Sequence, residues 1–152
     1  MIELLIADDH PLVRKGLREI LEGEIDLKVV GEAGTAQEVF DGLGKNKTDV
    51  LITDISMPGT SALNMIADVK QLFPKLPILV LTMHPEERFA VRTLKSGAAG
   101  YLTKDTPPEE IIKAVRVVAS GKKYITPSLA EKLATEIDSD FGRQPHERLS
   151  DR

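Results

Sequence analysis

Residues 49–54 read DVLITD, and residues 55–60, which follow directly, read ISMPGT. The first run is short, almost continuously apolar and closed by a carboxylate, which is typical of a strand covered on both faces of a parallel sheet. Met57, Pro58 and Gly59 have the composition of a turn, so Asp54 is expected where the strand opens into a loop. Open α/β sheets bind their ligands at this end of the strands. The stretch therefore predicts a buried parallel strand that presents a reactive acid at its exit.

Four more apolar runs, at 2–7, 27–33, 77–82 and 99–102, alternate with segments whose apolar residues recur at helical spacing. The helices are expected from Pro11 to Gly23, from about Thr35, over about 61–73, over about 86–96, and from Pro108 to Gly121. This alternation predicts an α/β fold, a doubly wound parallel sheet with right-handed crossovers. Five strands favour the order 2-1-3-4-5, in which the first and third strands are neighbours.

Polar side chains stand at the ends of these runs. Asp8 and Asp9 follow the first run, Thr82 closes the fourth, and Lys104 lies just past the fifth. Because the ends of parallel strands share one edge of the sheet, these side chains and Asp54 are expected to converge on one crevice. Three acids, a hydroxyl and a lysine can together hold a divalent cation and a phosphoryl group.

The chemistry of each group favours phosphoryl transfer. Mg²⁺ takes carboxylate, water and phosphate oxygens, so one acid of the Asp8–Asp9 pair can bind it directly while the other holds a metal-bound water. Asp54 is the candidate nucleophile that accepts the phosphoryl group. Lys104 supplies a compact positive charge, and Thr82 can donate a hydrogen bond. The histidines at 10, 84 and 146 are scattered, and none of them is assigned as a metal ligand.

Composition narrows the class of protein. The 152 residues, 41% hydrophobic and 29% charged, suit one compact domain and a tail. A net charge of −4 provides no basic footprint for nucleic acid within this chain. There is no cysteine, which excludes disulfides and thiolate metal sites. No apolar run approaches the roughly 20 residues of a membrane span, and no leader is expected. We expect a soluble cytoplasmic protein.

The pattern changes after residue 121. Residues 122–138 are expected to contain a turn and then an extra C-terminal helix over about 127–138. Residues 139–152 are mostly polar and are expected to form a linker, whose last four residues, LSDR, have the composition of a helix start with Ser150 as its N-cap. Three parts follow from this pattern: residues 1–121 as the main domain, 122–138 as a linker helix, and 139–152 as a connection to a further domain.

Helical spacing also predicts which residues are buried. On the first and third helices the expected apolar stripes are Leu12, Val13, Leu17, Ile20 and Leu21, and Leu63, Ile66, Ala67, Val69 and Leu72. The fifth helix carries more apolar residues than the single stripe that covers a sheet. Either this helix is deeply buried, or it forms a homodimer together with the first helix; we predict the homodimer.

The motifs at these positions resemble the receiver domain of bacterial two-component response regulators. The resemblance covers residues 1–121 and is carried by Asp8-Asp9, Asp54 with 57–59 (MPG), Thr82 and Lys104. The stretches DDHP at 8–11, GYLTKD at 100–105 and GKKYITP at 121–127 are similar to the subfamily with a LuxR-type helix-turn-helix effector, also called NarL/FixJ.

This resemblance implies a phosphorylation switch. Asp54 would accept phosphate from a sensor histidine kinase, and Thr82 and Lys104 would contact the phosphoryl group. Asp9 would bind Mg²⁺ directly, Asp8 would bind it through water, and the backbone carbonyl of Ser56 would complete the protein ligands. Tyr101 would be the aromatic switch residue. Residues 149–152 would open a LuxR-type DNA-binding domain, so DNA binding would belong to a domain outside this chain.

Two alternatives belong to other classes. A phosphohydrolase with an aspartyl-phosphate intermediate, like the haloacid dehalogenases, would need a second acid two residues after Asp54, where this chain has Ser56. A receiver-like module that serves only to bind other proteins would not need the full set of site residues. Steady turnover of a phosphomonoester would indicate the first alternative, and weak magnesium binding would indicate the second.

Overall fold

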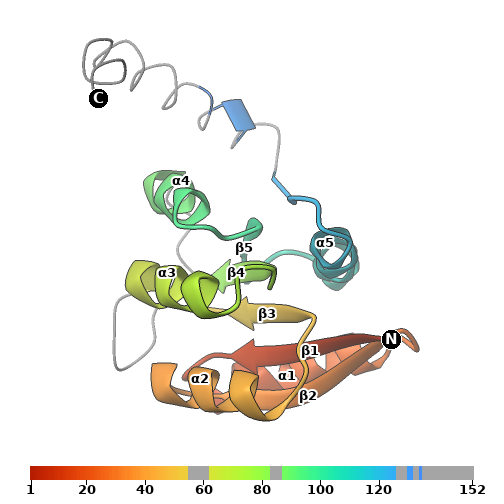
Figure 1. The fold of residues 1–152 in the computed structure, drawn as a ribbon. Coiled ribbons are helices and arrows are strands. Elements are labelled where there is room, and N and C mark those ends of the chain that lie inside the picture. The colour runs from red at the N-terminus through yellow and green to blue at the C-terminus, as the bar shows by residue number, and fades with distance from the viewer. Residues whose placement is uncertain (55–61, 83–86, 126–129, 132–133, 135–152) are drawn as a thin grey trace, which may run out of the picture.

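The computed structural model describes residues 1–54, 62–82, 87–125, 130, 131 and 134. The strands are β1 (Ile2–Ala7), β2 (Leu27–Ala33), β3 (Val50–Thr53), β4 (Ile78–Thr82) and β5 (Gly100–Thr103). The helices are α1 (Pro11–Glu22), α2 (Ala36–Lys45), α3 (Ala62–Leu72), α4 (Glu87–Lys95) and α5 (Pro108–Ala119). Strands and helices alternate along the chain as the sequence predicts (Figure 1).

The strands form one parallel five-stranded sheet in the order β2-β1-β3-β4-β5. This confirms the predicted doubly wound fold and places β1 beside β3. In the register of these two strands Ala7 pairs with Thr53. The residues that leave the two strands, Asp8 and Asp54, therefore start from adjacent points on the same edge of the sheet.

Two apolar layers cover the sheet, and β1 contributes to both. Its Leu5 and Ala7 point into a cluster with α2, α3 and α4, whereas Leu4 and Ile6 point into a cluster with α1 and α5. This alternation follows from the two-residue period of a strand. All four side chains are nearly inaccessible to solvent, which explains why the predicted strands read as continuous apolar runs.

Local signals in the sequence fix several helix starts. Pro11 and Pro108 occupy first-turn positions, where the missing N–H costs nothing. At the start of α2 the Thr35 hydroxyl accepts a hydrogen bond from the Glu38 amide at 3.2 Å. In return the Glu38 carboxylate accepts one from the Gly34 amide at 2.6 Å. This reciprocal capping box satisfies two backbone donors at the helix end.

Three residues of the predicted stripes lie on the wrong side of their helices. Leu12 is 82% exposed and Leu72 is 65% exposed, and Ala67 is exposed as well. Leu12 is five residues before the buried Leu17, and at 3.6 residues per turn this places it roughly 140° away around α1. On α3 the buried face instead includes Met65.

The chain continues past α5 along the outer edge of β5. Tyr124 forms a parallel bridge with Gly100, and the Tyr124 amide donates a hydrogen bond to the Ala99 carbonyl at 2.9 Å. A Cβ on Gly100 would lie 3.0 Å from the Tyr124 carbonyl oxygen and 2.9 Å from Leu79 Cδ1, so this close approach requires glycine. The sequence pattern predicts a turn here but not this pairing.

The described part of the predicted 127–138 helix consists of Ala130, Glu131 and Ala134, and these residues are helical. The rest of that segment and the whole predicted linker over 139–152 lie outside the described residues.

Candidate functional site

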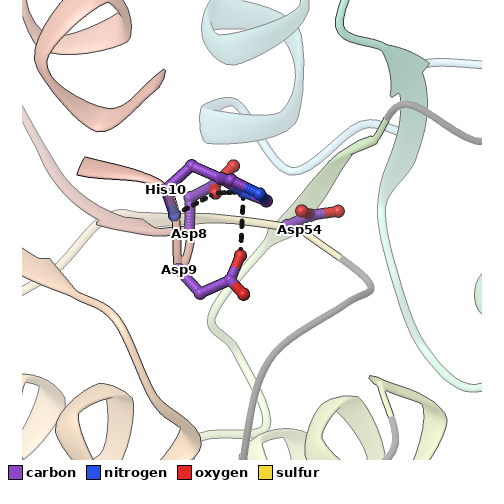
Figure 2. A group of neighbouring side chains, drawn as sticks. All are labelled: Asp8, Asp9, His10 and Asp54. Carbon is purple, nitrogen blue, oxygen red and sulfur yellow. Dashed lines mark hydrogen bonds and ion pairs between the residues drawn. The ribbon is translucent and has the colours of Figure 1, made fainter. Parts of the chain in front are cut away.

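The acidic doublet and Asp54 meet at the edge of the sheet where β1 and β3 end (Figure 2). The Asp8 amide donates to the Ala33 carbonyl at 2.9 Å, and the Asp54 amide donates to the Ala7 carbonyl at 3.0 Å. These bonds extend the sheet pairing by one residue and hold both acids beside each other. Asp8 and Asp54 are buried, whereas Asp9 is exposed.

Lys104 joins the buried acids. Its Nζ lies 2.5 Å from Asp8 Oδ2 and 3.0 Å from Asp54 Oδ2, and its side chain is only 8% exposed. The Lys104 amide donates to the Thr82 carbonyl at 2.7 Å, which continues the pairing of β4 with β5 past the end of the strand. Lys104, which follows β5, therefore contacts Asp8, which follows β1, and Asp54, which follows β3.

These contacts outweigh the cost of burial. Burial alone raises the pKa of the Asp8 carboxyl, but hydrogen bonds from Lys104 and from the His10 backbone and ring leave this pKa below its usual value. Burial likewise lowers the pKa of Lys104, but the bonds to Asp8 and Asp54 leave it above its usual value. The buried ions are therefore kept charged by each other.

Among the described residues Asp8, Asp9, Asp54 and Lys104, acidic side chains outnumber basic ones. Asp8, Asp9 and Asp54 carry three negative charges, and Lys104 supplies a single positive charge. The possible ligand atoms of these acids and of His10 lie within 4.8 Å of one another. Carboxylate oxygens are the ligands of hard divalent cations such as Mg²⁺. The residues present therefore fit a magnesium ion in both charge and donor type.

His10 belongs to this cluster, which the sequence did not lead us to expect. Its Nδ1 lies 3.0 Å from Asp8 Oδ1 and 2.9 Å from Asp9 Oδ1, and its amide donates to Asp8 Oδ1 at 2.8 Å (Figure 2). The one feature of the sequence that indicates this contact is that His10 directly follows Asp8 and Asp9. The other histidines, at 84 and 146, lie outside the described residues.

The other predicted site residues are Thr82, Tyr101 and Ser56. Thr82 is fully buried at the end of β4 and pairs in register with Thr103 of β5. Tyr101, on β5, is 6% exposed and belongs to the same apolar cluster as Val91 and Leu94 of α4. Ser56, whose backbone carbonyl is the predicted metal ligand, lies outside the described residues.

A groove of about 880 Å³ lies elsewhere, at the opposite end of the strands. Its lining includes Met1, Asp49, Phe73, Pro77 and Gly121, and none of the predicted site residues. We place the site at the acidic cluster and not at this groove, because the buried charges and possible metal ligands are found at the cluster.

Comparison with known proteins identifies the family. Residues 4–116 match the family model described as response regulator receiver domain. The chain belongs to this family. The receiver domain is 37% identical over 153 aligned positions to the response regulator UvrY of Escherichia coli K12, and the match covers all of this chain and 70% of UvrY.

Solved structures agree with this assignment. A two-component response regulator of the LuxR family from Aurantimonas sp. SI85-9A1 has a TM-score of 0.80 and 30% identity, covering 88% of this receiver domain and 96% of that chain. A structure of two RcsB dimers bound to two parallel DNAs has a TM-score of 0.79 and 35% identity, covering 87% and 66%. The chain is therefore a receiver domain of a LuxR-type response regulator, a regulatory family in which phosphorylation acts as a switch.

Within the described residues, no helix combines the length and the apolar character needed to cross a membrane.

Proposed function

We propose that Asp54 accepts a phosphoryl group from a sensor histidine kinase, with Mg²⁺ held by Asp8, Asp9, Asp54 and the backbone carbonyl of Ser56. The observation that carries this proposal is the contact of Lys104 with both Asp8 and Asp54, beside a cluster of possible metal ligands that includes Asp9. Within the proposed ligand set, Asp9 would bind the metal directly and Asp8 would bind it through water.

The transfer is a substitution at phosphorus. An Asp54 carboxylate oxygen forms the new bond to phosphorus while the bond to the donor histidine nitrogen breaks, and that imidazole keeps the electron pair of the broken bond. Lys104, already 3.0 Å from Asp54 Oδ2, stabilises the charge on the transferred group. Thr82 donates a hydrogen bond to a phosphoryl oxygen. When bound, Mg²⁺ supplies further neutralisation of that charge.

The same pocket accounts for the regulatory role. The domain assists its own phosphorylation and its own dephosphorylation, and acts on no other substrate. In the structure Tyr101 is buried, and its polar tip would allow a second, exposed position. Phosphorylation draws Thr82 toward the phosphoryl group and shifts a two-state equilibrium in which Tyr101 and the surface of α4 and β5 change.

The output of the switch lies beyond the receiver domain. We infer that residues 1–121 form the receiver, that 122–138 form a linker helix, and that 139–152 lead to a LuxR-type DNA-binding domain. The related RcsB is bound to DNA as dimers, which supports DNA binding and transcriptional control by the intact protein. We infer that the protein acts in the cytoplasm, where it would meet the kinase and the DNA.

The proposed homodimer uses α5 and α1. On α5, Ile111 and Val115 are buried against the sheet, whereas Ile112 and Val117 keep part of their surface accessible. On α1, Leu12 is 82% exposed. Apolar surface left open on these helices supports association through them.

Incubation with acetyl phosphate and magnesium tests the phosphoacceptor. Intact-mass spectrometry is expected to show the gain of one phosphoryl group in the wild type, none in Asp54→Asn, and a normal gain in Asp41→Asn. Asp41 is a suitable control because it is an exposed acid on α2. A wild type that gains no mass, or an Asp54→Asn variant that gains as much as the wild type, would contradict the proposal. Release of phosphate in many turnovers from a phosphomonoester would instead support the phosphohydrolase.

A further inference from the structure

Arg14 lies on α1 and reaches back to the loop that carries the acidic doublet. Its Nη1 donates a hydrogen bond to the backbone carbonyl of Asp8. Its Nε donates to Glu32 Oε1 on β2 at 3.2 Å, and the side chain is 19% exposed. One planar guanidinium therefore connects the sheet to the peptide group between Asp8 and Asp9.

Glu32 is a firm anchor for this contact. It lies on β2 in register with Ile6 of β1, so its position is fixed by strand pairing next to the acidic loop. Arg18 donates from Nη1 to Glu32 Oε2 at 2.7 Å, so the two carboxylate oxygens bind two different arginines. Hydrogen bonding to Arg18, and then to Arg14, outweighs burial and keeps the pKa of Glu32 below its usual value.

Gly34 leaves room for the guanidinium. A Cβ at this position would lie 3.2 Å from Arg14 Nη1 and 3.9 Å from the Asp8 carbonyl oxygen. A side chain here would press on the end of Arg14 that contacts the acidic loop. Glycine at position 34 therefore leaves the space that the Arg14 guanidinium occupies.

The backbone of Asp8 is held at both ends. Its amide donates to the Ala33 carbonyl at 2.9 Å, and its carbonyl accepts from Arg14. The orientation of this peptide determines where the Asp8 side chain and the following Asp9 side chain point. We propose that Arg14 is a positioning residue for the metal pocket, which fixes both carboxylates through the Asp8 backbone without touching the phosphoryl group.

This inference rests on the proposed magnesium site. The charge of Arg14 is committed to a carbonyl and to Glu32, so its removal leaves the carboxylates of the doublet in place but less well oriented. Residues that orient metal ligands from behind typically change metal affinity by about 10- to 100-fold when replaced. We expect the lower end of this range because Arg14 acts through the main chain.

The chain contains a matched control. Arg18 shares Glu32 with Arg14 and also donates to Glu22 at 3.2 Å, and in the described part of the chain its hydrogen bonds go to these two carboxylates. Titration calorimetry with MgCl₂ on the whole chain compares the wild type with Arg14→Met and Arg18→Met, and urea unfolding of each protein measures its stability. We expect Arg14→Met to raise the magnesium dissociation constant about tenfold, and Arg18→Met to leave it within about twofold, as for a surface substitution remote from the ligands.

A second variant, Arg14→Lys, keeps the test decisive if Arg14→Met does not fold. Arg14→Lys keeps the charge but loses the planar two-sided geometry, so it is expected to weaken magnesium binding less than Arg14→Met does. Phosphorylation by acetyl phosphate gives a further measurement: the magnesium concentration for half-maximal rate rises in both Arg14 variants, while the rate at saturating magnesium changes little.

Each outcome decides a different statement. If the wild type binds magnesium and both Arg14 variants bind it equally well, the positioning role is wrong and the proposed function stands. Equal weakening in Arg14→Met and Arg18→Met would also reject it, since loss of fold stability alone would then explain both. If the wild type itself takes up no magnesium, the proposed site fails and the inference fails with it.

Discussion

Replacement of Lys104 by methionine tests the account of the pocket most directly. Its side chain is 8% exposed, and those of Asp8 and Asp54 are 4% and 5% exposed. The substitution removes the contact of Lys104 with both acids and preserves most of the side-chain volume. Removing one partner of a buried ion pair costs about 3–5 kcal/mol, because the remaining charge is left without compensation. We therefore expect the free energy of unfolding without magnesium to fall by about 3 kcal/mol.

Urea unfolding followed by circular dichroism measures this change. For a domain of this size the free energy falls by about 1–3 kcal/mol per molar urea, so the midpoint is expected to move down by roughly 1–3 M. Lys47→Met is the matched control, since Lys47 is 76% exposed and lies 3.8 Å from its two acidic neighbours. Exposed pairs contribute about 0–1 kcal/mol, so this variant should unfold close to the wild type.

Magnesium and pH provide two checks on the cause. A divalent cation in the pocket compensates the same carboxylates, so saturating MgCl₂ should restore part of the stability that Lys104→Met loses. The lowered pKa of Asp8 contributes stability that is present above the ordinary Asp value of about 3.9 and is lost as the pH falls through the folded value. The difference between wild type and variant should therefore narrow at acidic pH. An unchanged midpoint in Lys104→Met, or a loss that magnesium does not reduce, would refute this reasoning.

Three further substitutions test the packing and the charges around the site. Gly100→Ala should lower the free energy of unfolding by about 1–3 kcal/mol, because the new Cβ would lie 2.9 Å from Leu79 Cδ1. Gly44→Ala is the control: no atom lies within 4 Å of its new Cβ, so this change should raise the free energy of unfolding by up to about 1 kcal/mol. Thermal melts compare the two variants. Thr93→Val should raise the melting temperature, because the buried Thr93 hydroxyl has no hydrogen-bond partner in the described part of the chain. Burying such a hydroxyl without a partner destabilises the fold by about 1 kcal/mol or more. A lower melting temperature in the variant would argue against this reasoning. Because the pKa of Glu32 is lowered in the folded state, the stability of the wild type should fall more steeply than that of Glu32→Gln as the pH drops below the ordinary Glu value of about 4.3. Thermal melts at a series of pH values measure this difference. Parallel curves of melting temperature against pH would contradict the prediction.

The sequence predicted the fold well because the apolar runs are long enough to specify buried strands. The run 49–53 predicts a strand followed by the acid Asp54, and the structure has β3 at Val50–Thr53 with Asp54 at its exit. The predicted strand order is sufficient to place Asp8 beside Asp54. Topology alone was sufficient for this, because all residues that end parallel strands share one edge of the sheet.

Contacts that depend on side-chain direction were not predictable in the same way. His10 and Arg14 reach the acidic loop through particular rotamers, and neither the period of a helix nor the spacing of residues encodes those. Leu12 was assigned to the buried face because it is apolar, but its angular position on α1 turns it to solvent. The pairing of Tyr124 with Gly100 joins residues on either side of α5, and such non-local contacts have no periodic signature.

The pairing of Tyr124 with Gly100 has a consequence for self-association by strand addition. An edge strand offers free amide and carbonyl groups to which another polypeptide can add. Here the Ala99 carbonyl at the start of β5 is already used by the chain's own Tyr124. At the other edge β2 carries Lys28 and Glu32 and shifts its register between Leu4 and Leu5 of β1, features that discourage a foreign strand. These features oppose the joining of copies of this domain into a continuous intermolecular sheet, and they agree with the proposed association through the helices α1 and α5.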